Sequence, residues 1–419
     1  MSAQAGAGNQ VVTMTAARGP RAARLGCLLA ALSVVACATG PRKPAAPTRL
    51  GPAAPIGFPE TVRSLGSDRH FFVSHLEEIR QRVNSARGSG PINILALSGG
   101  GSGGAFGAGA LVGLGRRGER PQFTVVTGVS TGALLAPFAF LGPAWDTQLK
   151  EAFVSARTGH LLHSRGIAAL FRPGVYEGKP LIELVDHYVT DALIQEIARE
   201  SAKGRMLLIA TTDLDKEEPV IWDMGAIASH GGEAARTLFR DVLVASASIP
   251  GLFPPVLIHV SDSQNSYDEM HVDGGTTAPF FFTWQVAPLL TLPVEATDDL
   301  KGANLYVIIN GQLGTTPQTT REKTIPILKR SFSTQLMHTM RTTLELSVEF
   351  SRLYGMNLQF SRIPATYPYQ GPLNFQPPAM QALFDYAAGC AANGHFWTTP
   401  ERVLLRVEQP LGPEACPGE

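Results

Sequence analysis

The stretch that most constrains the fold runs from residue 92 to residue 132. It contains an apolar run at 92–97, a glycine-dense turn, a small-residue segment with helical spacing and a second apolar run at 123–127, followed by Gly-Val-Ser-Thr-Gly at 128–132. Two buried strands joined by a helix make a βαβ unit, and its parallel strands end at the same edge of a sheet. The sequence therefore predicts that the glycine turn and the serine turn lie at one sheet edge.

The rest of the chain repeats the alternation of strands and helices. Further strands are expected at residues 206–210, 220–222, 256–260, 305–309 and 356–363, and further helices at 180–202, 234–247, 325–354 and 378–392. This order predicts an α/β fold whose mostly parallel sheet is covered on both faces. With 419 residues and no internal repeat, the chain is expected to form one catalytic domain over 61–419, with a motif-bearing core at 92–280 and a C-terminal helical extension.

The N-terminus has the layout of an export signal. Three arginines precede an apolar run at 25–36 that is too short to span a bilayer as a helix. Residues 34–37 (Val-Val-Ala-Cys) resemble the lipobox of bacterial lipoproteins, which implies cleavage of residues 1–36 and acylation of Cys37. Plain secretion or a transmembrane start are the alternatives.

The expected product is an exported bacterial lipoprotein held on a membrane by the lipid on Cys37. Ala38 follows the cysteine in place of the aspartate associated with inner-membrane retention, so the outer membrane is the expected location, on either face. Residues 38–60 are rich in Pro and Ala and are predicted to form an extended tether between the anchor and the domain.

Charge and cysteine content exclude several classes of partner. Lys+Arg and Asp+Glu both number 35, so a net charge of +0 gives no support for binding nucleic acid. None of the four cysteines has the spacing of a zinc site, and neither a metal nor a cofactor is expected. Cys390 and Cys416 either form a disulfide that closes the C-terminal tail or remain two separate thiols. The basic face of the helix at 325–354 could contact anionic lipid, although a solvated face is the simpler interpretation.

Ser130 lies at the centre of a G-x-S-x-G pattern. A strand precedes the pattern and an apolar helix at 133–140 follows it, so the serine is expected at a sharp strand-to-helix turn. Such a turn exposes the hydroxyl at the sheet edge beside a helix N-terminus. Ser130 is therefore a candidate nucleophile, and an ordinary helix-start serine is the alternative.

The glycine turn at 98–104 (Ser-Gly-Gly-Gly-Ser-Gly-Gly) follows a strand and opens a helix, so its N–H groups favour an anion. One candidate anion is a dinucleotide pyrophosphate, because Gly99, Gly101 and Gly104 match G-x-G-x-x-G. That interpretation needs an acidic residue at the end of the next strand, and residues 123–128 contain none. The other candidate is the oxyanion of an acyl-transfer intermediate, for which Ser130 supplies the nucleophile.

A serine nucleophile needs a base, and Asp273 is the candidate. It opens an Asp-Gly-Gly turn after a short apolar approach, whereas such a turn alone would indicate only a tight reversal. A carboxylate base must lie in a partly dry pocket to be basic enough. His338 and His395 follow Asp273 in the order of a Ser-acid-His triad, so a histidine base is the alternative.

These motifs together resemble the patatin-like lipid acyl hydrolases. The resemblance covers residues 92–280 and includes the glycine loop, the serine turn, the Asp-Gly-Gly turn and a block at 245–255. It implies a three-layer sandwich with a central, largely parallel sheet. It also implies a Ser-Asp dyad without histidine, with Ser130 as nucleophile, Asp273 as base, and an oxyanion site built by Gly99, Gly100 and Gly101.

The resemblance implies an enzyme that cleaves ester bonds of phospholipids or related membrane lipids. One position departs from the family pattern, because Gly103 stands where the loop usually carries Lys or Arg. A catalytically silent lipoprotein that binds lipid or a partner protein is therefore one alternative. A dinucleotide-binding oxidoreductase is the second.

Overall fold

The computed structural model describes residues 42–45, 53–66, 68–164, 166, 173–262, 265–282, 300–314, 319–399 and 415–418. The chain divides into two compact units, Met1–Arg42 and Lys43–Glu419. The predicted signal segment and Cys37 lie outside the described residues. Within the described residues, no helix is both long enough and apolar enough to cross a membrane.

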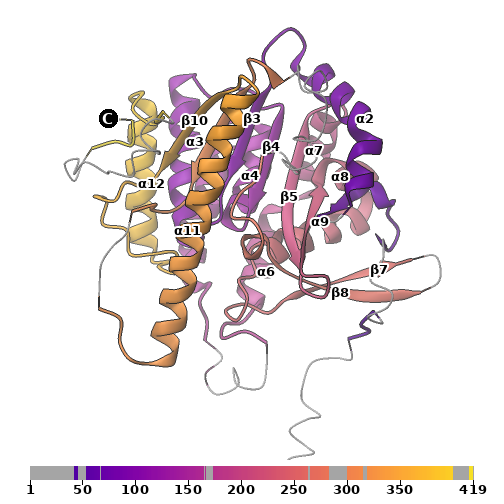
Figure 1. Cartoon of the computed structure of the whole chain (residues 1–419). Helices are drawn as coiled ribbons and strands as arrows, with labels where there is room; N and C mark the ends of the chain where they lie inside the picture. Colours follow the sequence, from indigo (N-terminus) through magenta and orange to yellow (C-terminus); the bar gives the residue numbers. More distant parts are fainter. Residues whose placement is uncertain are drawn as a thin grey trace, which may run out of the picture. The chain divides into compact units, whose positions relative to one another are not determined.

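One sheet organises the second unit (Figure 1). Its main path is formed, in spatial order, by β1 (Ala54–Pro55), β7 (Val256–Ser261), β8 (Ser266–Asp273), β5 (Met206–Asp213), β4 (Val125–Val129), β3 (Asn93–Leu97), β9 (Asn304–Ile309) and β10 (Asn357–Arg362). The strands from β5 to β10 on this path are all parallel, as predicted. Their carboxyl ends therefore form one edge, at which β3 leads into the glycine loop and β4 leads into Ser130.

The remaining strands are antiparallel and widen the sheet beside β5. β8 pairs antiparallel with β5 and forms a hairpin with β7, while β6 (Glu218–Asp223) joins β5 to β2 (Arg63–Leu65). Because β8 runs opposite to β5, Asp273 at its end pairs with Thr211 near the end of β5. This reversal brings a residue far along the chain to the edge that carries Ser130.

Helices cover both faces of the sheet, and the side chains of β3 divide between them. Leu95 and Leu97 belong to one core, whereas Ile94 and Ala96 belong to the other. The first core is covered by α3 (Gly104–Arg117), α4 (Thr131–Leu141), α5 (Asp146–Val154), α6 (Lys179–Tyr188), α7 (Asp191–Ser201), α8 (Met224–His230), α9 (Gly232–Ser246) and α12 (Pro377–Ala392). The second is covered by α2 (Arg69–Arg87) and α11 (Thr324–Leu353). The result is the predicted α/β sandwich of three layers.

One predicted helix was wrong. The helix expected over 180–202 is two helices, because Thr190 accepts a hydrogen bond from the Leu193 N–H at 3.2 Å and caps α7. Parts of the segment expected to form a tether, residues 38–60, contact the sheet. The Lys43 N–H donates to Asp268 Oδ2 at 2.9 Å, and β1 pairs with β7, both within the compact unit Lys43–Glu419.

Residues 415–418, near the C-terminus, are attached to α12 and its C-terminal end by a disulfide and hydrogen bonds. A disulfide joins Cys390 on α12 to Cys416. Nearby, the Tyr386 hydroxyl donates to the Ala415 carbonyl at 2.7 Å, and the Gly418 N–H donates to the His395 carbonyl at 2.8 Å. Since α12 packs in the core beside α3, the tail supports the helix that follows the glycine loop.

Candidate active site

Ser130 and Asp273 form a direct hydrogen bond. The Ser130 Oγ–H donates to Asp273 Oδ2 at 2.6 Å, and each residue is only 5% exposed. Ser130 is the residue between β4 and α4, and Asp273 ends β8. The structure thus brings the predicted nucleophile and the predicted base together from segments that lie 143 residues apart.

The main chain at Ser130 is held in an unfavourable conformation. Its φ is +55°, and Glu217 is the only other described non-glycine residue with a positive φ. Such a conformation costs on the order of 1–3 kcal/mol and persists only where its surroundings hold it. Here the Ser130 N–H donates to Ser246 Oγ at 3.0 Å, and Ser246 in turn donates to the Ala210 carbonyl on β5 at 2.7 Å. Sequence reasoning included Ser246 in a family block but assigned it no role.

Asp273 is buried, and hydrogen bonds fix both its main chain and its carboxyl group. Its N–H donates to the Ser248 carbonyl at 2.9 Å, and the Gly275 N–H donates to Oδ1 at 2.7 Å. Burial raises the pKa of Asp273 to about 7, although the hydrogen bonds from Ser130 and Gly275 act to lower it. The carboxyl group can therefore exchange a proton near neutral pH.

The glycine loop presents N–H groups beside Ser130. The Gly99 N–H is engaged, because it donates to the Pro279 carbonyl at 3.0 Å. Within the part of the chain that the structure describes, the N–H groups of Gly100 and Gly101 have no acceptor. Gly100 has a φ of +157°, and a Cβ there would lie 1.9 Å from the Asn310 carbonyl oxygen. Only glycine fits this position.

Residues beyond 300 hold the glycine loop in place. Asn310 Nδ2 donates to the Ser98 carbonyl at 2.7 Å, and the Asn310 N–H donates to Ser98 Oγ at 2.9 Å. The Ser102 N–H donates to the Pro372 carbonyl at 2.9 Å, and the Tyr369 hydroxyl donates to the Gly100 carbonyl at 3.2 Å. No local sequence signal marks these partners, because they contact the loop from more than 200 residues away.

Gly103 lies where no side chain fits. A Cβ there would be 2.1 Å from the Asn310 carbonyl oxygen and 2.9 Å from the Tyr369 hydroxyl. Burial raises the pKa of that hydroxyl, so it stays protonated and neutral. The departure from the basic residue of the family pattern therefore has a packing cause in this chain.

The comparisons with known proteins agree with these motifs. Residues 95–283 match the family model described as patatin-like phospholipase. The chain contains a patatin-like phospholipase domain. No curated protein matches the chain. Among solved structures, VipD from Legionella pneumophila aligns with 12% sequence identity and a TM-score of 0.36, covering 78% of this chain and 71% of that one. The matched domain supports lipid acyl hydrolase activity in general.

The two histidines of the alternative triad lie elsewhere in the patatin-like protein. His338 is exposed on α11 and His395 is exposed after α12. Among the described residues, neither forms a hydrogen bond with Ser130 or Asp273. Among the described residues, the hydrogen-bond partner of the Ser130 hydroxyl is the Asp273 carboxyl group.

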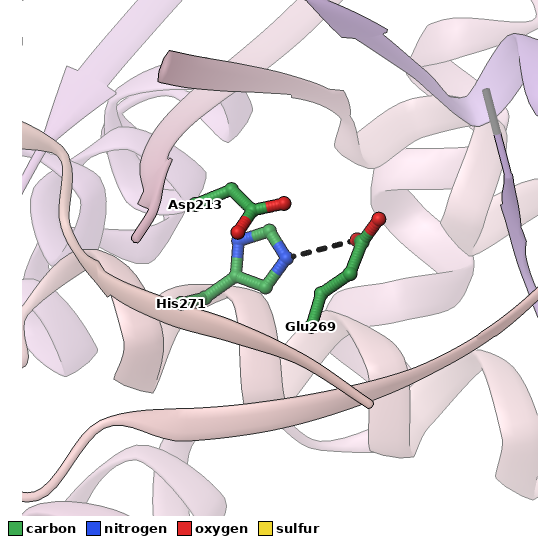
Figure 2. A group of neighbouring side chains, drawn as sticks. All are labelled: Asp213, Glu269 and His271. Atoms are coloured by element: carbon green, nitrogen blue, oxygen red, sulfur yellow. Dashed lines mark hydrogen bonds and ion pairs between the residues drawn. The ribbon is translucent and has the colours of Figure 1, made fainter. Parts of the chain in front are cut away.

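A buried group of titratable side chains lies behind the end of β8, where Asp213, Glu269 and His271 are neighbours (Figure 2). Trp222 Nε1 can only donate, and it bonds Thr211 Oγ1 at 2.8 Å, which leaves the threonine O–H to donate to His271 Nδ1 at 2.9 Å. His271 Nε2–H then donates to Glu269 Oε2 at 3.2 Å.

The same group contains its own cations. Lys216 Nζ lies 2.5 Å from Glu269 Oε1 and 3.4 Å from Asp213 Oδ2, and Arg63 forms an ion pair with Glu269. Burial acts to raise the pKa of Glu269, but hydrogen bonds from His271 and Arg63 outweigh it and hold the pKa well below its usual value. We interpret the group as an internal ion-pair network rather than a metal site, because Lys216 Nζ already pairs with the two carboxylates that would bind a metal ion.

An apolar pocket opens beside the glycine loop and the turn that carries Ser130. Gly101 of the glycine loop and Thr131, the residue after Ser130, line it. The rest of its wall is almost entirely apolar and comes mostly from helices of the first core, including Leu134, Phe138, Phe153, Leu184 and Met380. The pocket was not predicted from sequence, because its wall comes from six separate segments.

Proposed function

We propose that this chain is a serine acyl hydrolase that cleaves ester bonds of phospholipids or related lipids. The observation that carries the proposal is the 2.6 Å hydrogen bond from Ser130 to Asp273, whose buried carboxyl group has a pKa of about 7. A base with this pKa can take a proton at neutral pH. The match to the phospholipase family supports the same chemistry.

The proposed mechanism has two halves. In the first, Asp273 takes the proton from Ser130 as Oγ attacks the ester carbonyl, and the N–H groups of Gly100 and Gly101 donate to the resulting oxyanion. The intermediate collapses to an acyl-enzyme, and the leaving alcohol receives the proton from Asp273. In the second half, Asp273 takes a proton from the water molecule that attacks the acyl carbonyl. The tetrahedral intermediate then breaks its bond to Ser130 Oγ, which receives the proton from Asp273, and the fatty acid leaves.

The apolar pocket supports an acyl chain as the group transferred. Its lining includes Gly101 of the glycine loop and Thr131 beside Ser130, and the rest of the lining is almost entirely apolar. Burial of methylene groups is favourable at about 0.8 kcal/mol each. Esters with long acyl chains should therefore bind better than acetyl esters.

The test is hydrolysis of short-chain and long-chain esters by a chain that starts at residue 41. Ser130→Ala and Asp273→Asn should each lower kcat/KM by at least about 10³-fold, because the nucleophile or the base is lost. His338→Ala and His395→Ala serve as matched controls and should retain activity. Normal turnover by Asp273→Asn with loss in both histidine variants would replace the dyad by a triad.

Labelling by a fluorophosphonate probe separates the enzyme from its two alternatives. The active serine should react and Ser130→Ala should not. A silent lipid- or partner-binding protein would leave the probe unreacted. An oxidoreductase would also leave it unreacted and would quench the fluorescence of an added nicotinamide cofactor. Lipid analysis of native membranes treated with the wild type or Ser130→Ala would then identify the headgroup and the position cleaved.

We also propose that the mature protein is a lipoprotein of the outer membrane, anchored through Cys37. The support is the signal-like segment and the lipobox-like residues 34–37. Metabolic labelling with an alkyne fatty acid should mark the wild-type protein, and Cys37→Ala should remain unlabelled and leave the membrane fraction. Equal labelling of both forms would contradict the assignment.

A further inference from the structure

The two halves of α11 have different surroundings. From Met340 onward the helix packs on the sheet, with Leu344 and Val348 buried in the second core. Over residues 324–339, none of the side chains that the structure describes is buried. Three large apolar side chains are exposed in this first half, where Ile327 is 48% exposed, Leu328 is 59% exposed and Phe332 is 38% exposed.

The direction of α11 places its first half at the catalytic edge of the sheet. The helix ends at Leu353 and β10 begins at Asn357, so the helix runs back along the sheet before the chain enters β10. β10 is parallel to β9, and β9 to β3, so the N-terminal end of α11 points to the edge where β3 leads into the glycine loop. Figure 1 shows this end of α11 extending well beyond the strands.

Simple lengths agree with this placement. The buried half, residues 340–353, rises about 21 Å at 1.5 Å per residue, which is close to the length of a six-residue strand. The 16 residues of 324–339 continue for about 24 Å more. The first half therefore projects past the edge that carries Ser130, and none of its described side chains is buried.

Charge is distributed unevenly along the same helix. Residues 324–339 contain two basic residues, Lys329 and Arg330, and no acidic residue, a net charge of +2 in a chain whose total is +0. Residues 340–353 contain two basic and two acidic residues, a net charge of 0. The projecting half of α11 therefore combines a net positive charge with exposed apolar side chains, whereas the half that covers the sheet has no net charge.

We propose that residues 324–339 of α11 dock on the surface of an anionic lipid bilayer and orient the catalytic edge toward it. Leu328 and Phe332 are four residues apart and share a face, and together with Ile327 they would enter the interface while basic groups contact the lipid headgroups. A helical segment of 16 residues is only marginally stable in water by itself, so contact with a surface would stabilise residues 324–339. The orienting role rests on the proposed function, because it assumes a membrane-lipid substrate, whereas binding to the bilayer does not require catalysis.

The test is co-sedimentation with vesicles, using a chain that starts at residue 41 and so lacks the lipid anchor. Ser130→Ala is the parent, which keeps the vesicles intact. The parent should bind vesicles of 30% phosphatidylglycerol in phosphatidylcholine and bind phosphatidylcholine alone at least about tenfold more weakly. Adding Leu328→Asp with Phe332→Asp should weaken binding to the anionic vesicles by at least about tenfold.

The matched control is Leu346→Asp with Leu353→Asp, two leucines that are 60% and 63% exposed on the half of α11 that covers the sheet. This pair adds the same charge to the same helix, and its binding should stay within about twofold of the parent. Unchanged binding in the Leu328/Phe332 variant, or equal loss in both variants, would overturn the proposal. So would a parent dimer in light scattering that only the Leu328/Phe332 variant dissociates, because the face would then bind a second copy.

A soluble ester separates docking from chemistry. With Ser130 restored, the Leu328/Phe332 variant should hydrolyse a short-chain soluble ester at the same rate as the enzyme with an unchanged α11, and should hydrolyse vesicle phospholipid at least about tenfold more slowly than that enzyme. Loss of the soluble activity in that variant alone would overturn the docking role. Absence of soluble activity in every form would contradict the proposed function and leave the vesicle-binding result to decide the docking proposal by itself.

Discussion

Ser246 holds the main chain of Ser130 rather than its reactive hydroxyl. The Ser130 N–H donates to Ser246 Oγ at 3.0 Å, and the same hydroxyl donates to the Ala210 carbonyl at 2.7 Å. The bond fixes the residue whose φ of +55° is unfavourable for a side-chain-bearing residue. Ser246, the last residue of α9, therefore links the proposed nucleophile to Ala210 on β5.

Ser246→Ala should therefore lower activity without touching the reacting atoms. The buried Ser130 N–H and Ala210 carbonyl would lose their partner, at a cost of about 1–3 kcal/mol in the free energy of unfolding. Displacement of Oγ should reduce kcat by at least about tenfold. Ser248→Ala is the control, because that hydroxyl is equally buried but donates only to the Val244 carbonyl. Similar losses of kcat in both variants would contradict a specific positioning role.

The raised pKa of Asp273 predicts the pH dependence of catalysis. The base must be ionised, so kcat/KM should fall about tenfold per pH unit below a pKa of about 7. Above that pH the profile should be level until another group titrates. Ester hydrolysis measured from pH 4.5 to 9 checks this, and a level profile down to pH 5 would show that the carboxyl group has an ordinary pKa.

The same shift predicts a stability effect with a defined sign. Between the unfolded pKa of about 3.9 and the folded pKa of about 7, the folded state holds a proton on Asp273 that the unfolded state has released. The free energy of unfolding therefore decreases through this group as pH rises from about 4 to 7 and changes no further above that. Asp273→Asn removes the effect, so the variant should gain stability relative to wild type over this range. Parallel thermal denaturation series of the two proteins measure the difference.

The Cys390–Cys416 disulfide should stabilise the C-terminal layer. Its sequence separation of 26 residues corresponds to about 3.5 kcal/mol in the chain-entropy model of cross-links. The double variant Cys390→Ala, Cys416→Ala should unfold at a lower denaturant concentration, and reductant should shift the wild type toward it. The double variant itself should not respond to reductant, and an equal response in both proteins would mean that the effect does not come from this bond.

The sequence predicted the parts of the site that depend on short-range patterns. Ser130 lies in a strand-turn-helix motif whose residues are adjacent, and Asp273 is followed by the two glycines of its turn, so both were identified. The central parallel strands β3 and β4 were identified because they are buried on both faces and mostly apolar. β8 was recognised only at its end, because its first residues are polar and are paired in a hairpin with β7.

The supports of the site could not be predicted in the same way. Asn310, Tyr369 and Ser246 contact the loop or Ser130 through one or two hydrogen bonds each, over 116 to 269 residues of sequence. An asparagine or a serine has the same local pattern whether or not it has such a partner. The missed break between α6 and α7 is different, because Thr190 is an N-cap residue whose signal was present in the sequence.

Gly103 shows what a family pattern omits about packing. Restoring a basic residue there should not restore a family-like loop, because even a Cβ would lie 2.1 Å from the main-chain oxygen of Asn310. We expect Gly103→Ala and Gly103→Lys both to lower the melting temperature and to abolish ester hydrolysis. Tyr369→Phe should not rescue either variant, since the obstructing atom belongs to the main chain.

Gly389→Ala is the control, because Gly389 lies within α12 with no atom near its Cβ position, and alanine should stabilise that helix by about 0.5–1 kcal/mol. An active Gly103→Lys enzyme would show that the Asn310 segment can move away from the loop.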